Sequence, residues 1–173
     1  MISIQQIKQA LDKANHLEPK ATKLQPSAVL VPIVERPSGL QLILTQRAEH
    51  LKLPPGKISF PGGRMDDTDK SLIHTSLRET EEEIGIPDSK IEVIGKLDLQ
   101  PTITKFMIQP IVGIVESDYE LSISPDEVEE AFEVPLDFLF DPANQSKSYR
   151  EFKGIKFPLY SMPYQNRNIW GAT

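Results

Sequence analysis

Apolar and polar residues follow two different periods along the chain, and these periods predict its helices and strands. Apolar residues recur three or four positions apart over Ser3–Leu17, which predicts an amphipathic helix. The apolar run Ala28–Val34 predicts a buried strand, and the alternation in Leu40–Thr45 predicts a second one. Because the turn residues Pro37–Gly39 lie between these strands, we expect the two to form a hairpin.

The second half of the chain carries further strand patterns. Ile91–Leu97 and Met107–Glu116 are each predicted as a strand, and Tyr149–Tyr160 as a hairpin that turns at Lys153-Gly154. Ser124–Phe140 is predicted to be mainly helical. Since strands and helices do not alternate in a regular βαβ order, we expect an α/β fold with a mixed sheet and helices on its faces.

A long loop leads into the central helix. Proline and glycine dominate Arg47–Asp69, within which Lys57–Phe60 is expected to form a short strand. Asp69 is a suitable N-cap for the helix that follows, and Gly85 suits the left-handed position just past its end. One stripe of this helix is expected to face the core, and it consists of Ile73, Leu77, Thr80 and Ile84.

Four glutamates crowd the C-terminal part of this helix, where the helix dipole disfavours negative charge. Glu79, Glu82 and Glu83 share one face at i, i+3 and i+4, whereas Glu81 points elsewhere. Arg78 lies four residues before Glu82 and is expected to steady it. Three converging carboxylates suit a hard divalent cation such as Mg²⁺. A solvated acidic helix face is the alternative interpretation.

Composition narrows the classes of function. Lys and Arg number 19 against 25 Asp and Glu, a formal charge of −6, which argues against a nucleic-acid partner. Cysteine is absent, so thiolate catalysis and zinc–cysteine sites are excluded. No apolar run is long enough for a membrane span, and a cytoplasmic location is expected. With so acidic a chain, an anionic substrate is expected to need a metal ion or a few local cations.

The glycine-rich loop and the acidic helix together resemble the Nudix box, a motif of about two dozen residues. The resemblance rests on Gly63, Arg78-Glu79, Glu82-Glu83 and Gly85-Ile86. This chain has one residue more than the usual pattern between Gly63 and Arg78. The early acid of the motif therefore falls on Asp69 when counted from Gly63, and on Lys70 when counted back from Arg78.

A second resemblance lies upstream, over about residues 43–63. It is similar to the signature of the coenzyme A diphosphatase branch of the Nudix hydrolases. The matching positions are Leu44-Thr45-Gln46-Arg47-Ala48, Gly56 and Phe60-Pro61-Gly62-Gly63. Two positions depart from the signature, with Ile43 in place of leucine and Lys52 in place of arginine. Lys52 keeps the positive charge but lacks the planar fork of a guanidinium.

The resemblance implies one Nudix domain over residues 1–173, folded as an α/β/α sandwich with a loop–helix–loop catalytic motif at about residues 62–86. It implies hydrolysis of a small nucleotide substrate, coenzyme A, to 3′,5′-ADP and 4′-phosphopantetheine, with Mg²⁺ or Mn²⁺ as cofactor. The residues that it implies are Glu79, Glu82 and Glu83 for metal; Glu79, Glu82 and Arg78 for catalysis; and Arg47, Lys52, Gly62 and Gly63 for cofactor binding. Of the last four, the two cations are expected to bind phosphates, and a backbone carbonyl of Gly62 or Gly63 is a candidate further ligand of the metal.

Several points stay open at the level of sequence. Members of this family often recruit one more acid from a later loop, and Glu116, Glu127 and Glu130 are the candidates. The family also often forms homodimers. ADP-ribose, NADH or another nucleoside diphosphate derivative is the alternative substrate, and a non-catalytic nucleotide-binding module is the alternative function.

Overall fold

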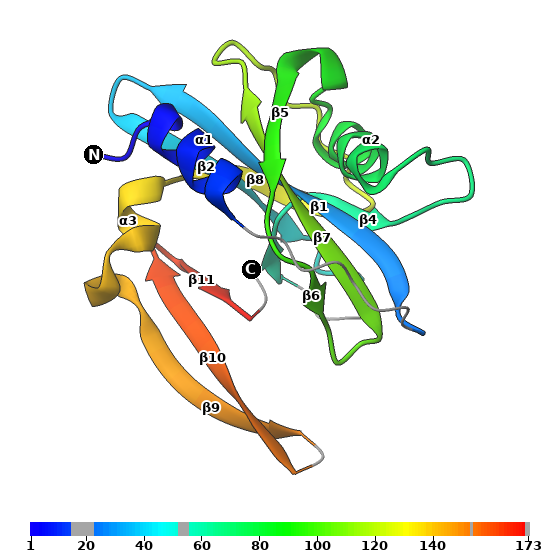
Figure 1. Ribbon diagram of the computed structural model, residues 1–173, viewed down its shortest axis with the longest axis vertical. Helices are drawn as coiled ribbons and strands as arrows, with labels where there is room; N and C mark the ends of the chain where they lie inside the picture. Colours follow the sequence, from blue (N-terminus) through cyan, green and yellow to red (C-terminus); the bar gives the residue numbers. More distant parts are fainter. Residues whose placement is uncertain (15–22, 52–55, 153, 172–173) are drawn as a thin grey trace.

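The computed structural model describes residues 1–14, 23–51, 56–152 and 154–171 (Figure 1). Helices and strands both contribute, in the order α1 (Ile4–Lys13), β1 (Gln25–Arg36), β2 (Gly39–Arg47), β3 (Ile58–Ser59), β4 (Gly62–Arg64), α2 (Leu72–Ile84), β5 (Ile91–Lys96), β6 (Gln100–Pro101), β7 (Phe106–Val115), β8 (Val128–Pro135), α3 (Leu136–Phe140), β9 (Ser146–Phe152), β10 (Ile155–Tyr164) and β11 (Arg167–Trp170). Two short 3-10 turns cover Asp88–Lys90 and Pro142–Asn144.

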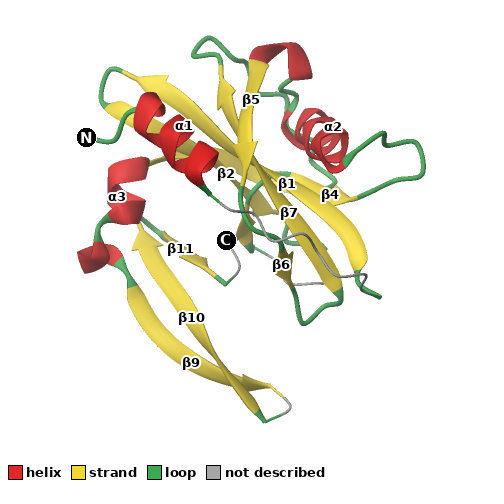
Figure 2. Cartoon of the chain, in the orientation of Figure 1, coloured by secondary structure: helices red, strands yellow, loops and turns green. Residues whose placement is uncertain are grey.

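In the described part of the chain, eight strands form one mixed sheet (Figure 2). Its central path runs β3-β2-β1-β7-β5, with β4 beside β1, β6 beside β7 and β8 beside β2. β1 and β7 are parallel, whereas the other pairs are antiparallel. The expected mixed sheet is therefore confirmed.

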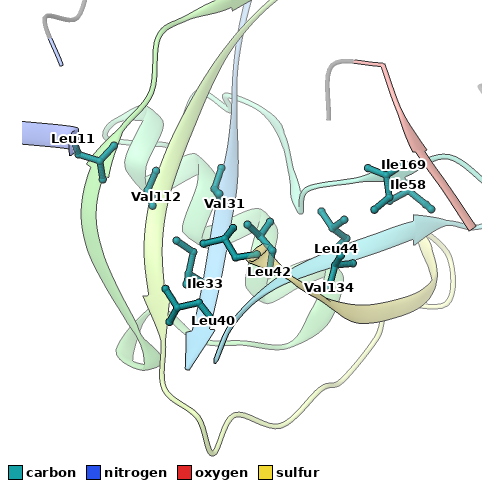
Figure 3. Packing of buried hydrophobic residues seen from close by; sticks show 11 residues of the cluster. Leu11, Val31, Ile33, Leu40, Leu42, Leu44, Ile58, Val112, Val134 and Ile169 are labelled. Carbon is teal, nitrogen blue, oxygen red and sulfur yellow. The ribbon is translucent and has the colours of Figure 1, made fainter. Parts of the chain in front are cut away.

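Alternation along the central strands gives this sheet two buried faces. Val31 and Ile33 of β1 belong to one hydrophobic cluster, and Val34 belongs to the other. The first cluster packs under α1 and α3 and reaches β11, as Figure 3 shows for Leu11 and Ile169. The second packs under α2, through Ile84 and the residues around it. Because helices cover both faces, the layers are those of an α/β/α sandwich.

A second, three-stranded sheet follows, in the order β11-β10-β9. Its β9–β10 hairpin extends away from the main sheet (Figure 1). The contacts that attach this sheet to the main one include those of Ile169 and Arg167, both of β11. Ile169 lies in the core cluster that contains Ile58 of β3, and Arg167 forms an ion pair with Glu130 of β8. The predicted hairpin over Tyr149–Tyr160 is confirmed, with strands at Ser146–Phe152 and Ile155–Tyr164. Lys153, at its predicted turn, lies outside the described residues.

One predicted element is wrong. The sequence predicts a mainly helical Ser124–Phe140, but Val128–Pro135 forms β8 and only Leu136–Phe140 is helical. The acids and alanine of this segment favour a helix locally, but pairing with β2 overrides that preference. Glu133 is held within the strand by the guanidinium of Arg36, 2.6 Å away.

The other predicted elements agree with the structure within a few residues at their ends. The first helix begins after its N-cap Ser3 and ends at Lys13, and the predicted extension to Leu17 lies outside the described residues. Among the described residues, no helix is long and apolar enough to cross a membrane.

Candidate metal and substrate site

The helix that carries the acids, α2, begins and ends with local signals. Ser71 is its N-cap, and the Ser71 hydroxyl accepts a hydrogen bond from the His74 backbone amide. The prediction that Asp69 caps the helix is therefore wrong. Gly85 closes the other end in the left-handed conformation, with φ of 75°, as expected.

The buried face of α2 is more polar than the predicted stripe. Thr80 and Ile84 are fully buried, but Ile73 is 43% exposed, and Leu77 is only partly buried. Hydroxyl residues take the remaining buried positions, at Thr75 and Ser76. They fit because their hydroxyls find acceptors nearby: Ser76 donates to the Ile73 carbonyl, and Thr80 to the Ser76 carbonyl.

Asp69 is buried beside the helix, where it binds Arg78 through two hydrogen bonds. Arg78 Nε donates to Asp69 Oδ1 at 2.9 Å, and Nη2 donates to Oδ2 at 2.8 Å. The Thr75 hydroxyl and the Asp66 backbone amide donate to the same carboxylate. The Arg78 guanidinium and these donors hold the pKa of Asp69 well below its usual range. Of the two candidates for the early acid, only Asp69 therefore faces Arg78.

Arg78 connects this buried carboxylate to the acidic face. Its Nη1 donates to Glu79 Oε1 at 2.9 Å and to Glu82 Oε2 at 3.0 Å. Its Nη2 donates to the Arg64 backbone carbonyl at 3.1 Å, which ties the helix to β4. The predicted contact of Arg78 with Glu82 is thus present. Because its donors are directed at fixed acceptors, the guanidinium fixes the rotamer of Glu79.

Three carboxylates converge at the C-terminal half of α2. Glu79, Glu83 and Glu127 each offer an oxygen, and the three oxygens lie within 4.8 Å of one another. Glu82 lies on the same helix face but pairs with Arg78, and its side chain is 54% exposed. The structure thus brings together two of the three predicted metal-binding glutamates and adds Glu127.

Glu127 reaches the site because the segment before β8 docks on the end of α2. The backbone amides of Ser122 and Ser124 donate to the carbonyls of Ile84 and Glu83, both at 2.9 Å. These bonds satisfy carbonyls that a helix end leaves without partners. From the other side, the Ala48 amide donates to the Glu127 carbonyl at 3.0 Å. Spacing along the sequence contains no signal for this contact.

The other two candidates for the later acid have cationic partners elsewhere. Glu116 accepts from Lys90 Nζ at 2.6 Å, next to Asp118. Glu130 pairs with Arg167 of β11. Among the three acids, only Glu127 lies with Glu79 and Glu83.

Gly62 and Gly63 allow the loop and the acids to approach closely. A Cβ on Gly63 would lie 2.5 Å from Glu79 Cδ, which is closer than two carbon atoms can approach. Gly62, at φ of 154°, would place a Cβ against the Ala28 carbonyl oxygen of β1, also closer than contact allows. Both positions therefore require glycine, one for the carboxylate and one for the strand.

Glu83 is electrostatically the most unusual acid of the site. Burial, together with repulsion from Glu79 and Glu127, raises the pKa of Glu83 to about 8. A hydrogen bond from the Gly62 backbone and the charge of Arg47 oppose this rise. Burial and the charges of Glu82 and Glu127 also raise the pKa of Glu79, against the opposing effect of Arg78. Such a set of oxygen donors fits a hard divalent cation, whose charge would stabilise the ionised forms.

The upstream signature lies next to these acids. The Thr45 hydroxyl donates to the Ser59 carbonyl at 3.1 Å, which joins β2 to β3. The Arg47 amide donates to the Lys57 carbonyl, and its own carbonyl accepts from the Gly56 amide. The Arg47 side chain is exposed, and its charge acts on Glu83. Lys52, the other predicted substrate-binding cation, lies outside the described residues.

Comparison with known proteins identifies the family. The sequence model of the NUDIX domain matches residues 24–153. The chain therefore belongs to the Nudix family and is a Nudix hydrolase, in agreement with the resemblance of its Nudix box. Hydrolases of this family generally need divalent metal ions, and the cluster of Glu79, Glu83 and Glu127 supplies suitable ligands.

Among curated proteins, several relatives carry the name "Uncharacterized Nudix hydrolase NudL". The one from Escherichia coli O7:K1 is 50% identical over 147 residues, which cover 85% of this chain and 76% of that protein. The one from Escherichia fergusonii is 40% identical over equal shares of the two chains. Neither name states a substrate, so the coenzyme A branch rests on the upstream signature alone.

Solved structures with the same fold are more distant in sequence. The Ap4A hydrolase of C. elegans in a binary complex has a TM-score of 0.56 at 17% identity, covering 64% of this chain and 80% of that one. The NUDIX domain of Shewanella oneidensis NrtR, complexed with ADP ribose, has a TM-score of 0.51 at 24% identity, covering 71% and 80%. At these identities the likeness establishes the fold.

Proposed function

We propose that this Nudix hydrolase cleaves the diphosphate of coenzyme A or its derivatives to 3′,5′-ADP and 4′-phosphopantetheine. The observation that carries the proposal is the signature over residues 43–63, which runs beside the acidic cluster. Its strand β2 carries Arg47, its end forms β4, and the Ala48 amide holds Glu127. One continuous stretch of chain thus borders both the candidate metal ligands and a candidate phosphate-binding cation.

In this proposal Glu79, Glu83 and Glu127 hold Mg²⁺ or Mn²⁺. When bound, the ion neutralises phosphate charge and lowers the pKa of a coordinated water. The chain's own residues supply the rest. Arg78 orients Glu79 and Glu82, and Glu82, the most exposed of the acids bound by Arg78, is kept as a further candidate ligand or general base. Arg47 binds a phosphate of the substrate by a charge-assisted hydrogen bond.

Gly62 and Gly63 serve two purposes in this arrangement. Their missing side chains admit the Glu79 carboxylate and the strand β1, and they leave backbone groups at the border of the site. In this proposal residues 1–173 form a single Nudix domain, with its Nudix box at about residues 62–86. Besides water and the ion, a small nucleotide is the only partner that the reaction requires.

A substrate panel tests the proposal. Coenzyme A, ADP-ribose and NADH are incubated with the protein and Mg²⁺ or Mn²⁺, and the products are separated by chromatography. We expect preferential release of 3′,5′-ADP from coenzyme A, its loss in Glu83→Gln, and its retention in Glu81→Gln. Glu81 is a matched control because it is an exposed acid of the same helix outside the cluster.

The other outcomes are equally informative. Preferential cleavage of ADP-ribose or NADH would keep the metal site and reject coenzyme A as substrate. Binding of these compounds without turnover would indicate a nucleotide-binding module. Equal loss of activity in Glu81→Gln and Glu83→Gln would reject the cluster as the site of chemistry.

A further inference from the structure

The β9 strand at the end of the second sheet has an open edge. It pairs with β10 on one side, and among the described residues no strand pairs with its other side. Ser146–Glu151 are all exposed, and Tyr149 at the centre is 65% exposed. In Figure 1 the hairpin projects from the body of the molecule, with β9 on its outer side. This feature plays no part in the proposed hydrolysis.

Exposed edges of this kind are usually protected. Prolines, bulges or a covering segment prevent another strand from pairing with the edge. β9 contains no proline, and its register with β10 continues without a shift from Ser146 to Phe152. Charged side chains remain as the protection of this strand, and they protect an edge against a second copy only when like charges would meet.

The order of residues in β9 makes the strand complementary to itself. When two copies pair antiparallel with Tyr149 opposite Tyr149, Lys147 of each copy lies opposite Glu151 of the other. Arg150 lies opposite Ser148, so no like charges meet. The sequence Ser-Lys-Ser-Tyr-Arg-Glu-Phe thus places opposite charges two residues to either side of its central tyrosine.

Other two-fold registers lack this complementarity. Because side chains alternate between the faces of a sheet, a two-fold antiparallel pair must have one residue opposite itself. A register centred on Arg150 therefore places two arginines opposite each other, and one centred on Ser148 places Lys147 opposite Tyr149. Centring on Lys147 or Glu151 also brings two like charges together. Among pairs formed within the described strand Ser146–Phe152, only the register centred on Tyr149 gives two opposite-charge pairs, and such pairs stabilise neighbouring strands.

The flanking strand β10 supports the same register. Lys156 of β10 lies opposite Glu151 in the hairpin, so that Glu151 would be flanked by a cation on each side. Lys147 already lies over the rings of Tyr149 and Tyr160, 5.5 and 5.4 Å from their centroids, and these contacts hold it on the face where Glu151 of the other copy would arrive. The charges and the aromatic contacts of both strands are therefore compatible with a two-fold pairing.

We propose that two copies of this chain associate through β9, in an antiparallel two-fold pairing centred on Tyr149. The two three-stranded sheets then form one continuous sheet of six strands. The interface is isologous, because each copy contributes the same strand. Main-chain hydrogen bonds supply the association, and the pairs of Lys147 with Glu151 set its register. The proposal is independent of the substrate, since β9 carries none of the candidate site residues.

Charge reversal tests the pairing. Sedimentation velocity is measured for the wild type, Lys147→Glu, Glu151→Lys and an equimolar mixture of the two variants. The wild type is expected to dimerise. Each variant alone places like charges opposite each other twice, so we expect a dissociation constant raised roughly tenfold or more. In the mixture, both carboxylates of one variant face ammonium groups of the other, so dimers should return as a heterodimer.

Glu120→Lys is the control, because it makes the same change of net charge as Glu151→Lys at an exposed position outside the hairpin. It should dimerise like the wild type. Thermal melting and hydrolytic activity verify that each variant is folded. A wild type that stays monomeric at the highest soluble concentration, or a mixture that stays monomeric, would overturn the proposal. The proposal would also be overturned if each charge-reversal variant alone dimerised with the affinity of the wild type.

A cysteine substitution tests the register without altering charge. The chain has no cysteine, so Tyr149→Cys introduces a single thiol. Directly opposed residues of antiparallel strands have Cα atoms about 4.5–5.5 Å apart, which permits a disulfide. Mild oxidation should therefore cross-link Tyr149→Cys into a dimer, whereas Lys156→Cys on β10 should stay monomeric. Equal cross-linking of both variants would reject the proposed register.

Discussion

Two acidic clusters adjoin α2: the first is Asp69 with its partner Arg78, and the second is Glu79, Glu83 and Glu127. Their comparison shows that a bound guanidinium outweighs the effect of burial on the pKa of an acid, whereas neighbouring carboxylates add to it. The side chain of Asp69 is fully buried, yet its pKa is lowered, because Arg78 binds both of its oxygens. Glu83 is less completely buried, yet burial raises its pKa to about 8, because repulsion from Glu79 and Glu127 adds to the effect of burial instead of opposing it. The first cluster contains its own cation, and the second is suited to bind one.

The largest expected effect is the loss of stability when the buried pair of Asp69 and Arg78 is broken. Asp69→Asn leaves Arg78 without its main partner, and loss of one member of a buried pair costs about 3 kcal/mol of unfolding free energy. Urea unfolding measures this loss. Asp67→Asn, an exposed acid two residues earlier, is the matched control and should change stability little. Equal stability of Asp69→Asn and wild type would show that Arg78 is not held by this pair.

Replacing Glu83 of the second cluster by its amide should raise the unfolding free energy instead of lowering it. Glu83→Gln removes a charge that its surroundings disfavour, so the metal-free protein should gain about 2 kcal/mol of unfolding free energy at pH 8. Activity should nevertheless fall. Urea unfolding in EDTA measures the gain, with Glu81→Gln as the control. A destabilised Glu83→Gln protein would contradict the view that the surroundings of Glu83 disfavour its charge.

The pH dependence of stability distinguishes the contribution of Glu83 from that of Asp69 without any mutation. The folded-state pKa of Glu83 lies above the usual 4.5, so its stabilising contribution is fully present at low pH and is lost as pH rises toward 8. Asp69, whose pKa is lowered, contributes above its unfolded pKa and loses that contribution on acidification.

Melting curves between pH 5 and 9 in EDTA should therefore show a falling Tm, and Mg²⁺ should raise the Tm at pH 8 by about 5 °C. A Tm at pH 8 that is the same with Mg²⁺ as with EDTA would count against a metal site.

The smallest expected effect concerns Arg47, the cation whose charge opposes the raised pKa of Glu83. Arg47→Ala removes one charge-assisted hydrogen bond to a substrate phosphate, so we expect KM to rise roughly tenfold with kcat little changed. Steady-state kinetics with coenzyme A measures both constants. Arg150→Ala, an exposed arginine of β9, is the control. A fall in kcat with an unchanged KM would assign Arg47 a role in the chemical step instead.

Much of the fold and part of the candidate site could be predicted from the sequence, because they depend on neighbours in the chain. The helix before Gly85 follows from periodicity and from a glycine that tolerates positive φ. Glu79 and Glu83 lie four residues apart, so any helix places them on one face. The close approach of Gly63 to Glu79 agrees with a glycine pair shortly before that helix.

Long-range contacts decided the rest. The segment before β8 and β8 itself have a helical pattern, but strand pairing with β2 and the ion pair of Glu133 with Arg36 make β8 a strand. That strand and the docking of Ser124 on the end of α2 bring Glu127 to the acids. Asp69 has the position of a helix cap, but a guanidinium nine residues away binds it instead. Local sequence specifies backbone conformation and helix faces, whereas charge compensation depends on which distant groups the fold brings within a few ångströms.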